Sequence, residues 1–91
     1  MGWWHMTYIG DNVYWLFYEY NLIDYRYNSS TNNWDIFFEE YWYTKYNNLY
    51  VLETDGWMHI LEDKYSYDIR NDSLFLDGSF NGIRATSPFG I

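Results

Sequence analysis

The amino-acid sequence predicts an all-β protein, a single antiparallel meander of about eight short strands that curls into a small barrel or half-open barrel. Three observations predict this fold. Turn-forming residues recur at close intervals, the segments between them are rich in aromatic and β-branched residues, and Phe, Trp and Tyr make up 26% of the 91 residues. A chain of this length is one domain, 1–91, and because it buries only about 60–65% of its unfolded surface, large rings suit its core.

The turn signals set the boundaries of the expected strands. These signals are Gly10-Asp11-Asn12, Asn28 to Asn33, Asn47-Asn48, Asp55-Gly56, Asn71-Asp72, Asp77-Gly78 and Asn81-Gly82. The strands predicted between them are 3–9, 13–20, 23–27, 34–46, 49–54, 57–68, 73–77 and 83–87. The first three are favoured by their Trp, Tyr, Phe, Val and Ile content, which suits a pleated, half-buried surface.

The segment 34–46 allows two interpretations. Its apolar residues also match helical spacing, which leaves a helix open as the alternative. A strand is favoured because the segment is highly aromatic and because Asn47-Asn48 follows it, where a tight hairpin turn would fall.

The last four strands are supported by alternation and by their turns. In 49–54, odd and even residues share opposite faces, and in Tyr65 to Arg70 the odd positions are apolar or aromatic and the even ones polar. Strand 73–77 lies between two turn signals. Strand 83–87 ends at Pro88, which has no N–H to donate to a ladder and belongs at an edge or an end.

One internal repeat supports a meander of hairpins. Trp42 to Val51 (WYTKYNNLYV) aligns with Tyr67 to Leu76 (YDIRNDSLFL) at a shift of 25 residues. Each copy reads as strand, tight polar turn, strand. Such a meander closes naturally into a barrel, which removes the unpaired edges that promote aggregation.

These features resemble the small bacterial lipocalin-like domains. The residues that carry the resemblance are Gly2-x-Trp4 (or Trp3), Phe17 with the turn near Asn21, Trp42 with Asn48-Leu49-Tyr50-Val51, and Tyr67-Asp68-Ile69 with Asp72-Ser73-Leu74-Phe75-Leu76. The resemblance implies an antiparallel barrel of about eight strands, which side chains fill or which holds one small ligand. This chain departs from the family by stopping at Ile91 without a full closing strand, which predicts a barrel that is short, open or completed by a partner chain.

A second resemblance concerns the segment Gly82 to Pro88 (GIRATSP). It is similar to the reactive segment of staphostatins, small lipocalin-like inhibitors of bacterial cysteine proteases. The family carries glycine directly before Thr-Ser, whereas Ala85 stands there in this chain. The resemblance implies that Gly82, Arg84 and Thr86 contact a protein partner.

Charge and composition exclude several classes of protein. The net charge is −8, with 5 Lys or Arg against 13 Asp or Glu, so direct binding to nucleic acid is not expected, because it needs a positive groove. No apolar run is long enough for a membrane span, and Met1 to His5 lack the regions of a secretory signal. The acidity is explained by solubility, which is the default, by a basic protein partner, or by mimicry of a nucleic-acid surface.

The residues that carry catalysis or bind metals are not arranged for either task. Glu39-Glu40 and Glu62-Asp63 are adjacent on strands, where neighbours point to opposite faces, and they are better explained as edge charges. His5 and His59 lack the spacing of a metal site, and no serine-nucleophile, phosphate-binding or dinucleotide motif is present. The sequence therefore predicts a binding protein without a cofactor.

The first functional hypothesis is a small apolar or aromatic ligand bound in or at the mouth of the barrel. From strand position, the predicted ligand-binding residues are Trp15, Phe17, Trp42 and Tyr67, and the alternative that all four form the core stays open. The rival hypothesis is a protein-interaction module, including a protease inhibitor, that uses the acidic surface or the segment Gly82 to Pro88. Exposed rings also predict a tendency to self-associate.

Overall fold

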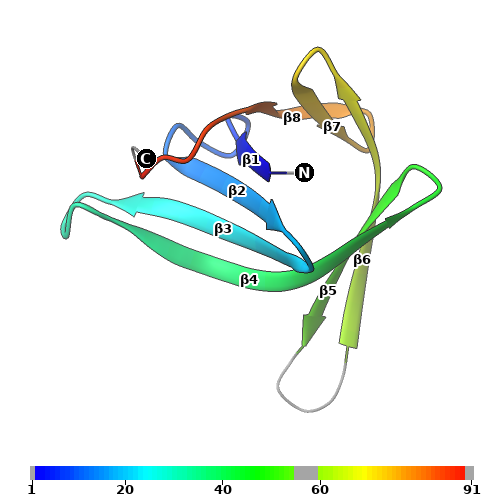
Figure 1. Cartoon of the computed structure of the whole chain (residues 1–91), viewed down its shortest axis with the longest axis horizontal. Coiled ribbons are helices and arrows are strands. Elements are labelled where there is room, and N and C mark those ends of the chain that lie inside the picture. Colours follow the sequence, from blue (N-terminus) through cyan, green and yellow to red (C-terminus); the bar gives the residue numbers. More distant parts are fainter. Residues whose placement is uncertain (1, 55–59, 90–91) are drawn as a thin grey trace.

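The computed structural model describes residues 2–54 and 60–89, which form a closed antiparallel β-barrel (Figure 1). Its strands are β1 (Gly2–His5), β2 (Val13–Tyr18), β3 (Asn21–Asn28), β4 (Asn33–Lys45), β5 (Asn48–Thr54), β6 (Ile60–Arg70), β7 (Ser73–Leu76) and β8 (Ser79–Arg84). Each strand pairs with the next, and β8 pairs with β1 through Trp4–Arg84 and His5–Ile83. The prediction of an all-β meander is confirmed, and the barrel is closed.

Tight turns set the register of the C-terminal hairpins. The central residues Tyr46 and Asn47, Asn71 and Asp72, and Asp77 and Gly78 all have φ between 49° and 81°, as two-residue type I′ turns require. The two copies of the internal repeat fold alike, as hairpins β4–β5 and β6–β7. Leu49 and Leu74, which occupy equivalent positions in the two copies, are both 0% exposed.

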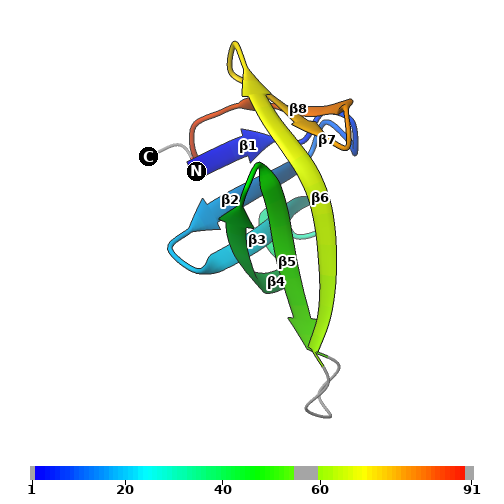
Figure 2. The same cartoon turned by 90° about the vertical axis from the view of Figure 1, so that its right-hand side faces the viewer.

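The segment predicted as 34–46 is a strand, and the helical alternative is wrong. β4 pairs with β3 from Asn33 to Tyr41 but with β5 only from Tyr41 to Lys45. β4 therefore passes from one part of the sheet to another near Tyr41. Figure 2 shows β5 and β6 running side by side toward one end of the molecule.

Alternate residues of the strands point inward and fill the barrel. The buried apolar residues are Trp4, Met6, Val13, Phe17, Leu22, Leu49, Val51, Leu74 and Leu76. Further half-buried apolar residues pack against them, namely Trp15, Phe38, Trp42, Tyr65, Tyr67 and Ile69. Part of the aromatic content thus serves as core, where a ring buries on the order of 150–250 Å², whereas other Tyr and Phe residues are exposed.

The two strands that close the barrel differ from the prediction. The first strand ends at His5, not at residue 9, because the Met6 carbonyl accepts hydrogen bonds from the Ile9 and Gly10 N–H groups, which turns the chain. The last strand is Ser79–Arg84, not 83–87, so Asn81-Gly82 lies inside β8 and is not a turn. A Cβ on Gly82 would lie 2.5 Å from the backbone oxygen of His5, so the glycine permits close approach of β1.

The segment after β8 lies against the outside of the barrel. Ala85 N–H donates a hydrogen bond to the Trp3 carbonyl at 3.1 Å. The Phe89 ring packs edge-on against Trp3 and Tyr25, with centroids 5.8 and 5.3 Å away. The predicted turn Asp55-Gly56 and the first residues of the strand predicted at 57–68 lie outside the described residues.

Candidate functional site

The four residues predicted to bind a ligand lie on inward-facing positions of β2, β4 and β6. Phe17 is 2% exposed, and its ring meets Trp42 edge to face at 5.0 Å and Trp15 at 6.2 Å. Tyr67 packs against the same core. The Nε1–H of Trp42 is buried without an acceptor among the described residues, which leaves a donor that a bound acceptor would satisfy.

A buried carboxylate holds Trp15. Asp24 is 0% exposed and accepts a hydrogen bond from Trp15 Nε1 at 2.9 Å. Arg26 donates to the same carboxylate through Nε at 3.0 Å and Nη2 at 3.2 Å. Both carboxylate oxygens are thereby satisfied, and the Trp15 ring is fixed in one orientation. Asp24 was not among the residues predicted from the sequence, although an acidic and a basic residue two apart on a strand share one face.

Trp15 opens onto a pocket of about 370 Å³ at one end of the barrel, which we call the mouth pocket. It is lined by Tyr8, Trp15, Tyr65, Leu76, Asp77, Ser79 and Asn81. Three aromatic rings and a leucine provide apolar walls, and the turn after β7 and the start of β8 provide polar groups. The β1–β2 connection contributes Tyr8, whose ring is 74% exposed.

The inward-facing residues near this end are acidic. Burial raises the pKa of Glu40 above its ordinary 4.5, and the charges of Glu53 and Asp63 raise it further. Burial also raises the pKa of the Tyr65 phenol, with additional contributions from Asp63, Asp77 and Glu40. Tyr65 therefore keeps its proton at neutral pH and has a hydroxyl able to donate into the mouth pocket.

The raised pKa of Glu40 predicts that Glu40→Gln is more stable than the unmodified protein at pH 7. The ionised carboxyl is penalised only in the folded state, so the difference is full above the folded pKa. It disappears as the pH falls below about 4.5, because the carboxyl then becomes protonated in both states. Because Glu40 is largely solvated, we expect a gain below about 1 kcal/mol.

Urea unfolding at pH 7 and pH 4 measures this difference. Glu39→Gln, which removes the same charge from the outward face of β4, is the control and should show a smaller change. A Glu40→Gln variant whose advantage grew at pH 4 would contradict the assignment.

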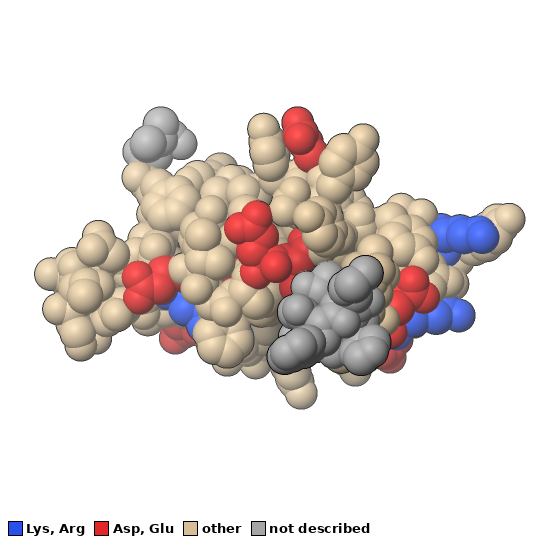
Figure 3. All heavy atoms as spheres, turned by 90° about the horizontal axis from the view of Figure 1, so that it is seen from below, with Lys and Arg blue, Asp and Glu red and all other residues tan. Residues whose placement is uncertain are grey.

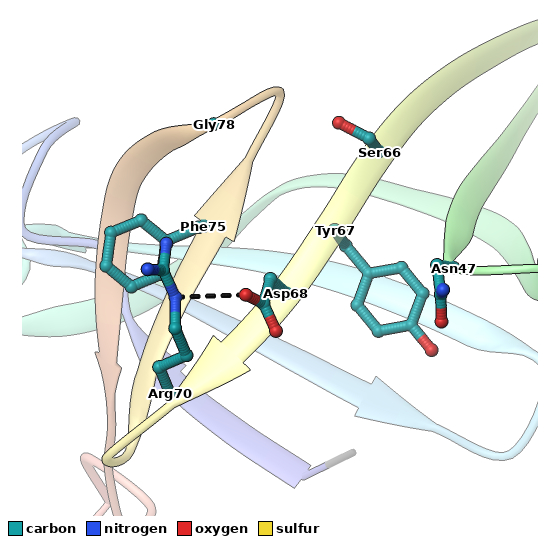
Figure 4. A pocket seen from close by; sticks show the side chains of 7 residues that line it. All are labelled: Asn47, Ser66, Tyr67, Asp68, Arg70, Phe75 and Gly78. Atoms are coloured by element: carbon teal, nitrogen blue, oxygen red, sulfur yellow. Dashed lines mark ion pairs between the residues drawn. The ribbon is translucent and has the colours of Figure 1, made fainter.

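A second hollow, of about 450 Å³, lies on the other side of the C-terminal hairpins (Figure 4). Its polar walls already bind one another. Arg70 Nε lies 2.9 Å from Asp68 Oδ2, and the guanidinium stacks 4.1 Å from the Phe75 centroid. Ser66 N–H donates to the Asp77 carboxylate at 2.9 Å. Little unsatisfied polarity remains for a ligand here.

The segment predicted to contact a partner is split by the fold. Gly82 is buried inside β8, whereas Arg84 and Thr86 are exposed beside a hollow of about 520 Å³. Arg84 is paired with Asp72 at 3.1 Å, and its guanidinium lies 4.6 Å from the Trp4 ring centroid. Of the three predicted residues, Arg84 and Thr86 are therefore the ones that face solvent.

Within residues 2–54 and 60–89, histidine and acidic side chains form no group of three or more that could hold a metal ion. No helix suited to crossing a membrane occurs in that part of the chain. Comparison with known protein families, with curated proteins and with solved structures found no match to this chain. The likeness to lipocalin-like domains and to staphostatins therefore stays a prediction from the sequence.

Proposed function

We propose that this protein is a non-enzymatic binding domain that holds a small ligand with an aromatic or apolar part in the mouth pocket. The observation that carries the proposal is the Trp15 ring, which Asp24 fixes at the wall of a 370 Å³ hollow opposite Tyr65. Small-ligand sites are typically concave, mostly apolar and about 300–1,000 Å³ in volume, with a few convergent polar groups.

The ligand is placed at the mouth and not deep in the barrel. Behind Trp15 the interior is occupied by packed side chains, including the edge-to-face pair of Phe17 and Trp42. Tyr65 and Trp15 are only half-buried, so their rings remain accessible. Asp77, Ser79 and Asn81 at the rim supply polar contacts.

Indole and phenol are suitable probes, and their binding is expected to shift amide resonances of Tyr65 and Asn81 and the indole N–H of Trp15. Tyr65→Ala should weaken indole binding at least tenfold, because it removes one apolar wall. The matched control is Tyr18→Ala, which removes an exposed ring from outside the barrel. Unchanged indole affinity in a folded Tyr65→Ala variant would refute the proposal.

A second candidate function is protein interaction, and the observation that favours it is the acidic surface beside β4. Glu39, Glu40 and Glu53 line a hollow of about 220 Å³ where β4 leaves β5. Figure 3 shows a group of acidic atoms in the middle of the face seen from below, and further acidic atoms beside the basic ones toward its two ends. A basic segment of another protein would meet opposite charge there.

A further inference from the structure

The first half of β4 has a backbone edge without a partner strand. β4 pairs with β3 from Asn33 to Tyr41 and with β5 only from Tyr41 onward, so Asn33 to Glu40 are paired on one side only among the described residues. The Trp42 N–H donates toward β3, to the Tyr20 carbonyl. Because alternate residues direct their backbone groups to opposite edges, the N–H and C=O of Glu39 face the open edge. In Figure 1 this edge forms the lower border of the barrel.

This edge lacks two of the usual protections against pairing. Residues 33–40 contain no lysine and no proline, the two residue types that most often blunt edges, and Ile36 and Phe37 are 54% and 65% exposed. The first part of β6 also pairs on one side only, but it carries Lys64. A bulge opposite Asp24 and Tyr25 bends β4, which hinders a long straight partner and leaves room for a short flexible one.

The charge beside this edge is not compensated. In the described part of the chain, Glu39, Glu40 and Glu53 have no lysine or arginine within ion-pair distance. Glu39 only accepts a hydrogen bond from Asn21 at 3.0 Å. The pKa of Glu40 is raised partly by Glu53, which shows that the negative charges act on one another. Cationic side chains placed beside this edge would relieve that repulsion.

We infer that the open edge of β4, from Asn33 to Glu40, docks a short extended peptide segment rich in lysine or arginine, which adds to the barrel as an extra strand. Backbone hydrogen bonds to the edge supply affinity, and the glutamates select basic residues. The inference rests on the second candidate function, protein interaction, and is independent of ligand binding in the mouth pocket.

A second copy of this chain fits the same edge poorly. Pairing the two β4 edges would place side by side two strands that carry acidic residues and no lysine or arginine, so a second copy offers this edge no complementary charge. Each copy also carries a net charge of −8. The edge glutamates thus oppose self-pairing and favour a basic partner.

The probe is a seven-residue peptide, Lys-Val-Lys-Thr-Lys-Val-Lys, with two matched peptides. One has glutamate in place of lysine, and the other keeps the lysines but is N-methylated on alternate backbone amides. The lysine peptide should bind and protect the Glu39 amide from hydrogen exchange. The glutamate and N-methylated peptides should each bind at least tenfold more weakly.

Two variants separate charge from backbone. Glu39→Gln removes the charge and keeps the edge N–H, whereas Glu39→Pro removes both and leaves the β3 ladder intact, because that N–H faces away from β3. Glu39→Pro should therefore lose several-fold more affinity than Glu39→Gln. If Glu39→Pro does not fold, the N-methylated peptide still tests the backbone contact.

The outcomes distinguish strand addition at the β4 edge from the broader protein-interaction function. Equal binding of the lysine and N-methylated peptides would overturn strand addition while keeping a charge-based protein surface. Failure of every peptide to bind would overturn the protein-interaction function at this edge as well. A concentration-dependent dimer that Glu39→Pro abolishes would overturn the basic peptide in favour of a second copy.

Discussion

Replacing Gly82 with alanine is expected to lower the free energy of unfolding by about 2–3 kcal/mol, the upper part of the range for overpacking. The added Cβ would meet the His5 carbonyl oxygen at 2.5 Å, the Met6 sulfur at 3.0 Å and the Met6 Cα at 3.1 Å. Two of these three atoms belong to backbone, so relief requires β1 and β8 to separate. These two strands close the barrel through only two residue pairs.

Gly10→Ala is the matched control, because its Cβ would meet only a Val13 methyl group at 3.6 Å, an ordinary contact. It should change stability by less than about 0.5 kcal/mol. Urea unfolding followed by far-ultraviolet circular dichroism measures both variants. A Gly82→Ala variant as stable as Gly10→Ala would show that the two strands do not approach closely in solution.

The strand content and the hairpins could be predicted because their signals are local. Type I′ turns need residues that tolerate positive φ. Asn71-Asp72 and Asp77-Gly78 are residue pairs of this kind, so these turns can be predicted from the sequence. In the segment 34–46, the spacing of the apolar residues was compatible with a helix as well as with a strand. The turn signal that follows the segment favoured the strand, and the structure has a strand there.

Long-range contacts could not be predicted in this way. Asn81-Gly82 has the composition of a turn, but the glycine is present because β1 passes within contact distance of it, and β1 lies about 77 residues away along the chain. Local composition does not distinguish a glycine that bends the chain from one that makes room for another strand.

The candidate site was predicted in part. Trp15, Phe17 and Trp42 do form one ring cluster, because inward positions follow from alternation once the strands are right. The remaining wall of the mouth pocket comes from Tyr8, Asn81 and the turn after β7, which only tertiary structure brings together. The open edge of β4 could not be predicted from the sequence either, because it depends on the residue at which pairing with β5 begins.

Replacing Arg26 with methionine is expected to have the largest effect, a loss of about 3 kcal/mol in the free energy of unfolding. The substitution keeps an apolar stem but leaves the Asp24 carboxylate, which is 0% exposed, without its cation. Removing one partner of a buried ion pair typically costs about 3–5 kcal/mol, because the remaining charge stays desolvated. We expect the lower end, since the Arg26 side chain is itself 37% exposed.

The difference in burial between the two partners predicts an asymmetric mutant cycle. Asp24→Asn leaves Arg26 without its carboxylate, but that cation reaches water. The amide oxygen of the new Asn side chain can still accept a hydrogen bond from Trp15 Nε1. This variant should therefore lose less stability than Arg26→Met. Adding Asp24→Asn to Arg26→Met removes the stranded charge and should recover more than half of the loss. Urea unfolding of the four proteins gives the coupling free energy. Equal losses in the two single variants would mean that water reaches Asp24, and the rigid Trp15 on which the mouth pocket depends would lose its physical basis.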